Sequence, residues 1–126
     1  MLPHNTCIPA EVDATTGLQI GPKLANPNPA KWPKRIVLHG RYCRLEPLDP
    51  GKHSDHLFAA SAVSDAAARF LYLPVAAPAT RNEFDAWIDN RSKFNDALYF
   101  AVIDTTTNRA EGRQSLMRID PPNQCI

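Results

Sequence analysis

The sequence has few cysteines and few glycines, no excess of charge of one sign and no long hydrophobic run. Its three cysteines are far apart among 126 residues, so they imply no disulfide framework and fit a reducing compartment. A formal net charge of +1 argues against a dedicated nucleic-acid binder, which normally carries a basic stripe. The most apolar stretch, residues 70–77, contains a proline and is far too short to span a bilayer. Residues 1–10 lack the order of a secretory signal. We therefore expect a soluble, cytoplasmic protein with neither nucleic acid nor a membrane as partner.

Proline, in contrast, is abundant near the N-terminus. Pro22, Pro27, Pro29 and Pro33 each remove a backbone donor from a region without helical or strand periodicity. We interpret residues 1–34 as a Pro-rich N-terminal arm, partly in polyproline conformation and laid over the domain through Trp32. A disordered tail is the alternative. Residues 35–126 then form the domain itself.

Two patterns predict the first elements of that domain. Residues 35–38 and 41–45 are typical of a β-hairpin with a two-residue turn at residues 39–40, where Gly40 would supply a positive φ. In that register one face is apolar and should pack against another layer; it carries Ile36, Leu38, Cys43 and Leu45. Tyr42, Arg44 and Glu46 should point the other way.

Helices are indicated by their caps and by periodicity. Asp49 followed by Pro50 is a good helix start, and a short helical turn is expected over residues 65–71. Thr80 and Glu83 form a capping-box pattern. The apolar stripe that follows, typical of a helix facing a core, comprises Phe84, Trp87, Ile88 and Phe94, with Arg91 at the i+7 position.

Two strands complete the pattern. Residues 98–103 are apolar on both faces, which indicates a central strand covered on two sides. A polar turn over residues 104–111 precedes a partner strand over residues 112–119, and residues 121–123 form another turn. The order β-β-α-α-β-β predicts a mixed α/β (α+β) fold. Only the opening of a further strand is expected at residues 124–126, so the domain would be incomplete.

Five segments in this order resemble the N-terminal half of the GNAT (Gcn5-related) N-acetyltransferase fold, most closely its RimJ/RimL-like branch. They are residues 38–48, 72–74, 83–88, 99–104 and 112–120. The resemblance implies transfer of acetyl from acetyl-CoA to a primary amine, either a protein N-terminus or a small amine, by direct attack of the neutral amine on the thioester. In that family an Arg/Gln-x-x-Gly-x-Gly/Ala loop at a helix start binds the pyrophosphate of acetyl-CoA.

That loop is absent, because no two of the five glycines lie two residues apart. Arg109 precedes Gly112 at the right distance, but Arg113 and Gln114 follow. We therefore assign no catalytic, cofactor-binding or metal residue and expect acetyl-CoA not to bind this chain. The resemblance places the substrate side near one wall of the acceptor-amine cleft, at Phe70, Tyr72, Leu73 and Pro74. A hydrophobic plug between helices is the alternative for these residues.

Other reactive residue types fit structural roles better. His53 and His56 have a spacing that could share a metal, but two ligands are too few, so we expect solvent-facing histidines. Cys43 near His39 falls on the apolar face, where a buried thiol is inert. Ser115 lacks the context of a nucleophile, and residues 105–108 fit turn chemistry.

Two hypotheses of function remain open. In the first, the chain is a fragment of an N-acetyltransferase and is inactive by itself, its partner being the amine substrate. In the second, it is a non-catalytic interaction module whose open sheet edge pairs with a strand of a partner or with another copy.

Overall fold

A computed structural model of the chain describes residues 10–126, so Cys7 lies outside the described residues. The chain forms β1 (Glu11–Val12), β2 (Gln19–Ile20), β3 (Leu38–His39), β4 (Cys43–Pro47), α1 (Pro50–Ser61), α2 (Ala66–Phe70), α3 (Arg81–Ser92), β5 (Leu98–Asp104), β6 (Ala110–Leu116) and a 3-10 turn, η1 (Pro121–Asn123). Helices and antiparallel sheets are mixed, which confirms the predicted α/β (α+β) class. Within residues 10–126 no helix has the length and apolarity needed to cross a membrane.

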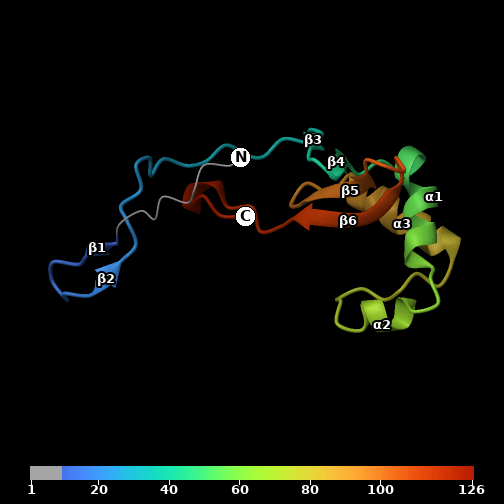
Figure 1. Cartoon of the computed structure of the whole chain (residues 1–126), viewed down its shortest axis with the longest axis horizontal. Coiled ribbons are helices and arrows are strands. Elements are labelled where there is room, and N and C mark those ends of the chain that lie inside the picture. The colour runs from blue at the N-terminus through green and yellow to red at the C-terminus, as the bar shows by residue number, and fades with distance from the viewer. Residues whose placement is uncertain (1–9) are drawn as a thin grey trace.

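The main sheet has four antiparallel strands in the order β3-β4-β5-β6, and Figure 1 shows α1 and α3 packed beside it. The short helix α2 stands away from the sheet on a long loop (Figure 1). Cross-strand pairing sets Glu46 opposite Ala101, and Ala101 belongs to the core that α1 and α3 cover. The helices therefore lie on the face of the sheet that carries Arg44 and Glu46.

The core lies between the two long helices and the sheet. Its buried members are Leu48, Leu57, Phe84, Ile88, Ala101, Ile103 and Ala110. On the opposite face of β5, Leu98 and Phe100 are only 3% and 1% exposed. Burial on both faces confirms the prediction of a covered central strand.

Both predicted N-caps are confirmed. The Asp49 carboxylate accepts a hydrogen bond from the backbone N–H of Lys52 at 3.2 Å and opens α1. The Thr80 hydroxyl accepts from the backbone N–H of Glu83 at 3.2 Å and opens α3. These local bonds fix where each helix begins, because the first N–H groups of a helix have no partner within it.

The register predicted for the first hairpin was wrong. Leu38 pairs with Leu45, four residues beyond the expected partner, and β3 has only two residues. The reason is tertiary, since the Tyr42 carbonyl accepts bonds from the N–H and the hydroxyl of Thr105 and is held against the β5–β6 loop.

Two further predictions for the first hairpin were wrong: the positive φ of Gly40 and the packing of the hairpin's apolar face. Gly40 has no positive φ; a Cβ there would approach the Cys43 carbonyl oxygen to 2.8 Å, so close approach explains the glycine. The helices cover the face of the hairpin that carries Arg44 and Glu46. On the predicted apolar face, Ile36 and Leu38 are 52% and 44% exposed.

The arm contains structure that its sequence did not predict. A small antiparallel hairpin, β1–β2, lies at the far end of the molecule from α1 (Figure 1). Trp32 is 47% exposed. Residues near the C-terminus contact the arm: the Gln124 side chain donates to the carbonyls of Asn26 and Asn28, and Ala30 N–H donates to the Pro121 carbonyl.

The last strand differs from its prediction mainly in its limits. β6 begins at Ala110 and ends at Leu116, whereas residues 112–119 were expected. Val102 pairs with Gly112 and Ile103 with Ala110, which leaves Glu111 as the extra residue of a β-bulge. The strand ends before Arg118, whose φ of 55° lies in the left-handed region.

Candidate functional site

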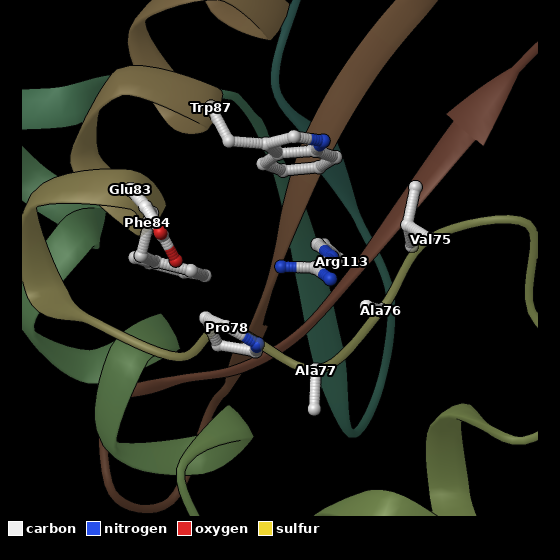
Figure 2. Close-up of a pocket in the computed structure, with 8 residues that line it drawn as sticks. All are labelled: Val75, Ala76, Ala77, Pro78, Glu83, Phe84, Trp87 and Arg113. Carbon is white, nitrogen blue, oxygen red and sulfur yellow. The ribbon is translucent and has the colours of Figure 1, made fainter.

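A pocket of about 280 Å³ lies between α3, β6 and the segment that follows α2 (Figure 2). Its size is at the small end for ligand pockets, which begin at roughly 300 Å³. Most of its lining is apolar, and two charged side chains, Glu83 and Arg113, join it. The full lining is Val75, Ala76, Ala77, Pro78, Glu83, Phe84, Trp87 and Arg113.

Arg113 is the central group of this pocket. Figure 2 shows its guanidinium below the indole ring of Trp87 and between Phe84 and the 75–78 segment. The guanidinium carbon lies 4.3 Å from the Trp87 ring centroid and 5.7 Å from those of Phe84 and Phe70. Such stacking holds a cation by the negative faces of the rings.

The donors of this cluster are incompletely satisfied. Arg113 Nη1 and Trp87 Nε1 are buried without a hydrogen-bond partner among the described residues. No carboxylate of residues 10–126 forms an ion pair with Arg113, although six other basic side chains of that range do pair with one. Burial lowers the pKa of Arg113 from its ordinary value, but an arginine stays charged at neutral pH. The pocket therefore presents a positive charge that no anion of the described chain neutralises.

Strand register and helix capping explain how these side chains meet. Arg113 lies opposite Ala101, so its side chain leaves β6 on the face that the helices cover. Phe84 and Trp87 are three residues apart on α3 and share one helix face, with ring centroids 6.5 Å apart. Because the Thr80 cap fixes where α3 begins, it also fixes where both rings lie.

The four residues predicted for the substrate side separate in the structure. Phe70 is half-buried and contacts Arg113, whereas Tyr72 and Leu73 are 93% and 52% exposed and Pro74 is exposed as well. A plug between helices does not describe these exposed residues. The pocket itself begins one residue later, at Val75.

Sequence reasoning missed Arg113 as a site residue. The sequence feature that could have indicated it is a single arginine on the helix-covered face of β6, the strand next to the central strand β5. Trp87 was assigned to the core; it packs against the core and also lines the pocket.

A second polar cluster lies under α1, and it corrects the prediction of solvent-facing histidines. His53 is 3% exposed; its Nδ1 accepts from Asp49 N–H at 3.0 Å, and its Nε2 lies 3.2 Å from a Glu46 carboxylate oxygen. His56 is half-buried, with its Nδ1 3.4 Å from Ala110 N. Glu46 lies on the sheet where α1 packs, and α1 places His53 against its carboxylate.

The carboxylate of this cluster is strongly held. Arg44 Nε donates to Glu46 at 2.7 Å, and this bond, together with the one from His53, lowers the pKa of Glu46 despite partial burial. Both carboxylate oxygens of Glu46 and both ring nitrogens of His53 have partners within the cluster, so a structural role accounts for these two residues.

The predicted nucleophile candidate Cys43 and its neighbour His39 differ in burial. Cys43 is half-buried, not fully buried as predicted, and the nearby His39 is exposed. Residues 105–108 form a turn as predicted, but the side chain that binds its backbone is that of Asp104, whose carboxylate accepts from the N–H groups of Thr106 and Thr107.

The described residues do not fit acetyl-CoA. The two long helices begin at Asp49 and Thr80, whose own side chains already take N–H groups of the first turn. A carboxylate at one of these ends would also repel a pyrophosphate. That acetyl-CoA does not bind this chain stays a prediction, tested below.

Solved structures supply the comparison. A crystal structure of a GCN5-related N-acetyltransferase from Brucella melitensis is similar over 78% of this chain, with 54% sequence identity and a TM-score of 0.74. The fold is part of the GNAT acetyltransferase fold. A probable GNAT-family acetyltransferase from Chromobacterium violaceum shares this fold over 81% of the chain, with 20% identity and a TM-score of 0.67.

The chain spans about half of these GNAT proteins, 44% of the Brucella protein and 50% of the Chromobacterium protein. No family model matches the sequence. No curated protein matches it either.

Proposed function

We propose that this chain is the N-terminal half of a GNAT N-acetyltransferase of the RimJ/RimL-like branch, whose reaction moves acetyl from acetyl-CoA to a primary amine. The observation that carries the proposal is the 54% identity to the Brucella N-acetyltransferase over 78% of the chain. The acceptor is a protein N-terminus or a small amine. The cytoplasm is the proposed location, in keeping with the free thiols of Cys43 and Cys125.

Within that reaction the chain supplies the acceptor side. The 75–78 segment, α3 and Arg113 enclose a pocket large enough for a small side chain or a small amine. Phe70, Tyr72, Leu73 and Pro74 lead into it along the chain. Since the residues described do not fit acetyl-CoA, the chain by itself is proposed to be inactive.

A chimera tests the family assignment. The part of the Brucella protein that aligns with this chain is replaced by this chain, and release of the CoA thiol is followed with a panel of primary amines. The unmodified Brucella protein is the control. We expect amine-dependent thiol release by the chimera; a folded chimera that releases no thiol with any amine that the control accepts would contradict the proposal.

The chain alone tests the cofactor prediction. A ligand that binds only the native state must raise its thermal stability. We expect no saturable change in melting temperature as acetyl-CoA is added to the 126-residue chain. A saturable rise would show that acetyl-CoA binds to this chain.

The alternative function is a strand-pairing module. β6 is an edge strand of the described sheet, and beyond it lies a hollow of about 490 Å³ formed by Ser115, Met117, Arg118, Cys125 and Ile126. Open edges template pairing with another strand. Sedimentation of the purified chain tests this: a stable monomer or a defined complex favours it, and aggregation counts against it.

A further inference from the structure

We propose that the Arg113 pocket binds a ligand with an apolar body and a carboxylate, so that the acceptor amine is a carboxylate-bearing amine such as an apolar amino acid or a short apolar peptide. As a statement about the acceptor, the proposal rests on the proposed function. The binding of a carboxylate does not depend on that function, because it involves only the pocket residues 75–78, Phe84, Trp87 and Arg113.

The charge of Arg113 favours a ligand carboxylate. Arg113 lines a mostly apolar pocket and pairs with no carboxylate of the described chain. A charge removed from water without an ionic partner is costly unless something compensates for it. A ligand carboxylate would supply that partner, and guanidinium binds carboxylates with two parallel hydrogen bonds.

Two donors of the pocket also favour a carboxylate. Arg113 Nη1 and Trp87 Nε1 have no acceptor among residues 10–126, and Figure 2 shows the indole directly above the guanidinium. Both donors therefore need the same kind of partner. An acceptor-only group such as a carboxylate matches that set, whereas an ammonium group, which only donates, does not.

The walls of the pocket favour a ligand with an apolar body. Val75, Ala76, Ala77 and Pro78 form one wall of the pocket and Phe84 another, so an apolar group is favoured beside the carboxylate. Glu83 also lines the pocket from the first turn of α3. An amine on the same ligand would find a carboxylate of opposite charge there.

Trp87 provides the readout. The chain has two tryptophans, Trp32 and Trp87, so a Trp32→Phe chain reports on the pocket alone. In that chain, the fluorescence of Trp87 is titrated with 3-phenylpropionate, L-phenylalanine, glycyl-L-phenylalanine and phenethylamine. We expect saturable changes with the carboxylates and at least about tenfold weaker binding of phenethylamine, which lacks the charge-assisted bond.

Two arginine variants separate recognition from packing. Arg113→Met should weaken binding of 3-phenylpropionate by at least about tenfold. Arg91→Met is the matched control, because Arg91 also stacks on Trp87, at 5.7 Å, and has a buried donor without a partner, yet it does not line the pocket. Binding to that variant should change less than about twofold. If Arg113→Met does not fold, Arg113→Lys replaces it, with a weakening of at least about threefold because lysine lacks the planar fork.

Several results would overturn the proposal: no saturation with any carboxylate, equal binding of phenethylamine, or equal effects of the two arginine variants. The ratio of L-phenylalanine to glycyl-L-phenylalanine affinity distinguishes a free amino acid from a short peptide. Failure of this proposal can also be distinguished from failure of the proposed function. An active chimera without carboxylate binding refutes only the pocket assignment, and carboxylate binding with an inactive chimera refutes only the acetyltransferase.

Discussion

Replacing Glu46 by glutamine should destabilise the chain in a way that depends on pH. Glu46 accepts two bonds, from Arg44 Nε at 2.7 Å and from His53 Nε2 at 3.2 Å. His53 cannot reverse its tautomer without losing the bond in which Nδ1 accepts from Asp49 N–H. A glutamine amide has one acceptor and one donor group, so its NH₂ must face either Arg44 or His53 and one bond is lost.

The size of the effect follows from that lost bond. A hydrogen bond to a charged group contributes about 1.5–3 kcal/mol, and at the entropy of unfolding of a chain of this length this corresponds to roughly 6–11 °C in melting temperature. The pKa of Glu46 in the folded chain is lowered from its ordinary value of 4.5, chiefly by the bond from Arg44. Its contribution is therefore fully present above that value and is lost as pH falls through the lower, folded pKa.

Thermal unfolding followed by circular dichroism measures this at pH 7 and at pH 3.5. The matched control is Glu111→Gln, because Glu111 pairs with Arg109 at 3.2 Å with both side chains about half exposed. Exposed pairs contribute little, so the control should lose no more than about a third as much stability. The reasoning fails if the two variants melt together at pH 7, or if the Glu46→Gln deficit is as large at pH 3.5 as at pH 7.

Three further substitutions test the fold by the same melting assay. Gly40→Ala should destabilise, because its Cβ would approach the Cys43 carbonyl oxygen to 2.8 Å, whereas Gly21→Ala has open space and should be neutral; equal effects would contradict this. Thr80→Ala should cost about 1 kcal/mol by removing the cap of α3, and Thr80→Ser should restore most of it; a neutral alanine would show that the cap is dispensable. Ile88→Ala, at a side chain 0% exposed, should cost about 2–5 kcal/mol, and a loss below about 1 kcal/mol would exclude it from the core.

The features predicted well from the sequence are those that depend on neighbours along the chain. The caps at Asp49 and Thr80 each use a side chain and an N–H three residues apart, so the sequence contains both partners. The strand over residues 98–103 was evident because both of its faces are apolar.

Features set by distant residues were missed. The register of the first hairpin depends on Thr105 binding Tyr42, which no local pattern shows. His53 is buried because Glu46 lies beneath α1, and Arg113 becomes a site residue only where β6, α3 and the 75–78 segment meet. The turn of the β1–β2 hairpin could have been predicted from local sequence, but the hairpin was missed because the arm was interpreted from its many prolines.

The turn of β1–β2 and the turn of β5–β6 are built alike. In each, an aspartate, Asp13 or Asp104, accepts from the N–H groups two and three residues ahead. In each, the fourth residue ahead, Gly17 or Asn108, has a positive φ and donates to the aspartate's carbonyl at 2.9 Å.

One copy lies in the arm and the other in the central sheet, so the turn does not depend on either environment. In kinetic terms, the short turn gives the β5–β6 pair a small loop-closure entropy cost. We expect that pair to form early, before α1 docks on it. Asp104→Ala should then slow folding more than it accelerates unfolding, and the reverse partition would assign the first step to another part of the sheet.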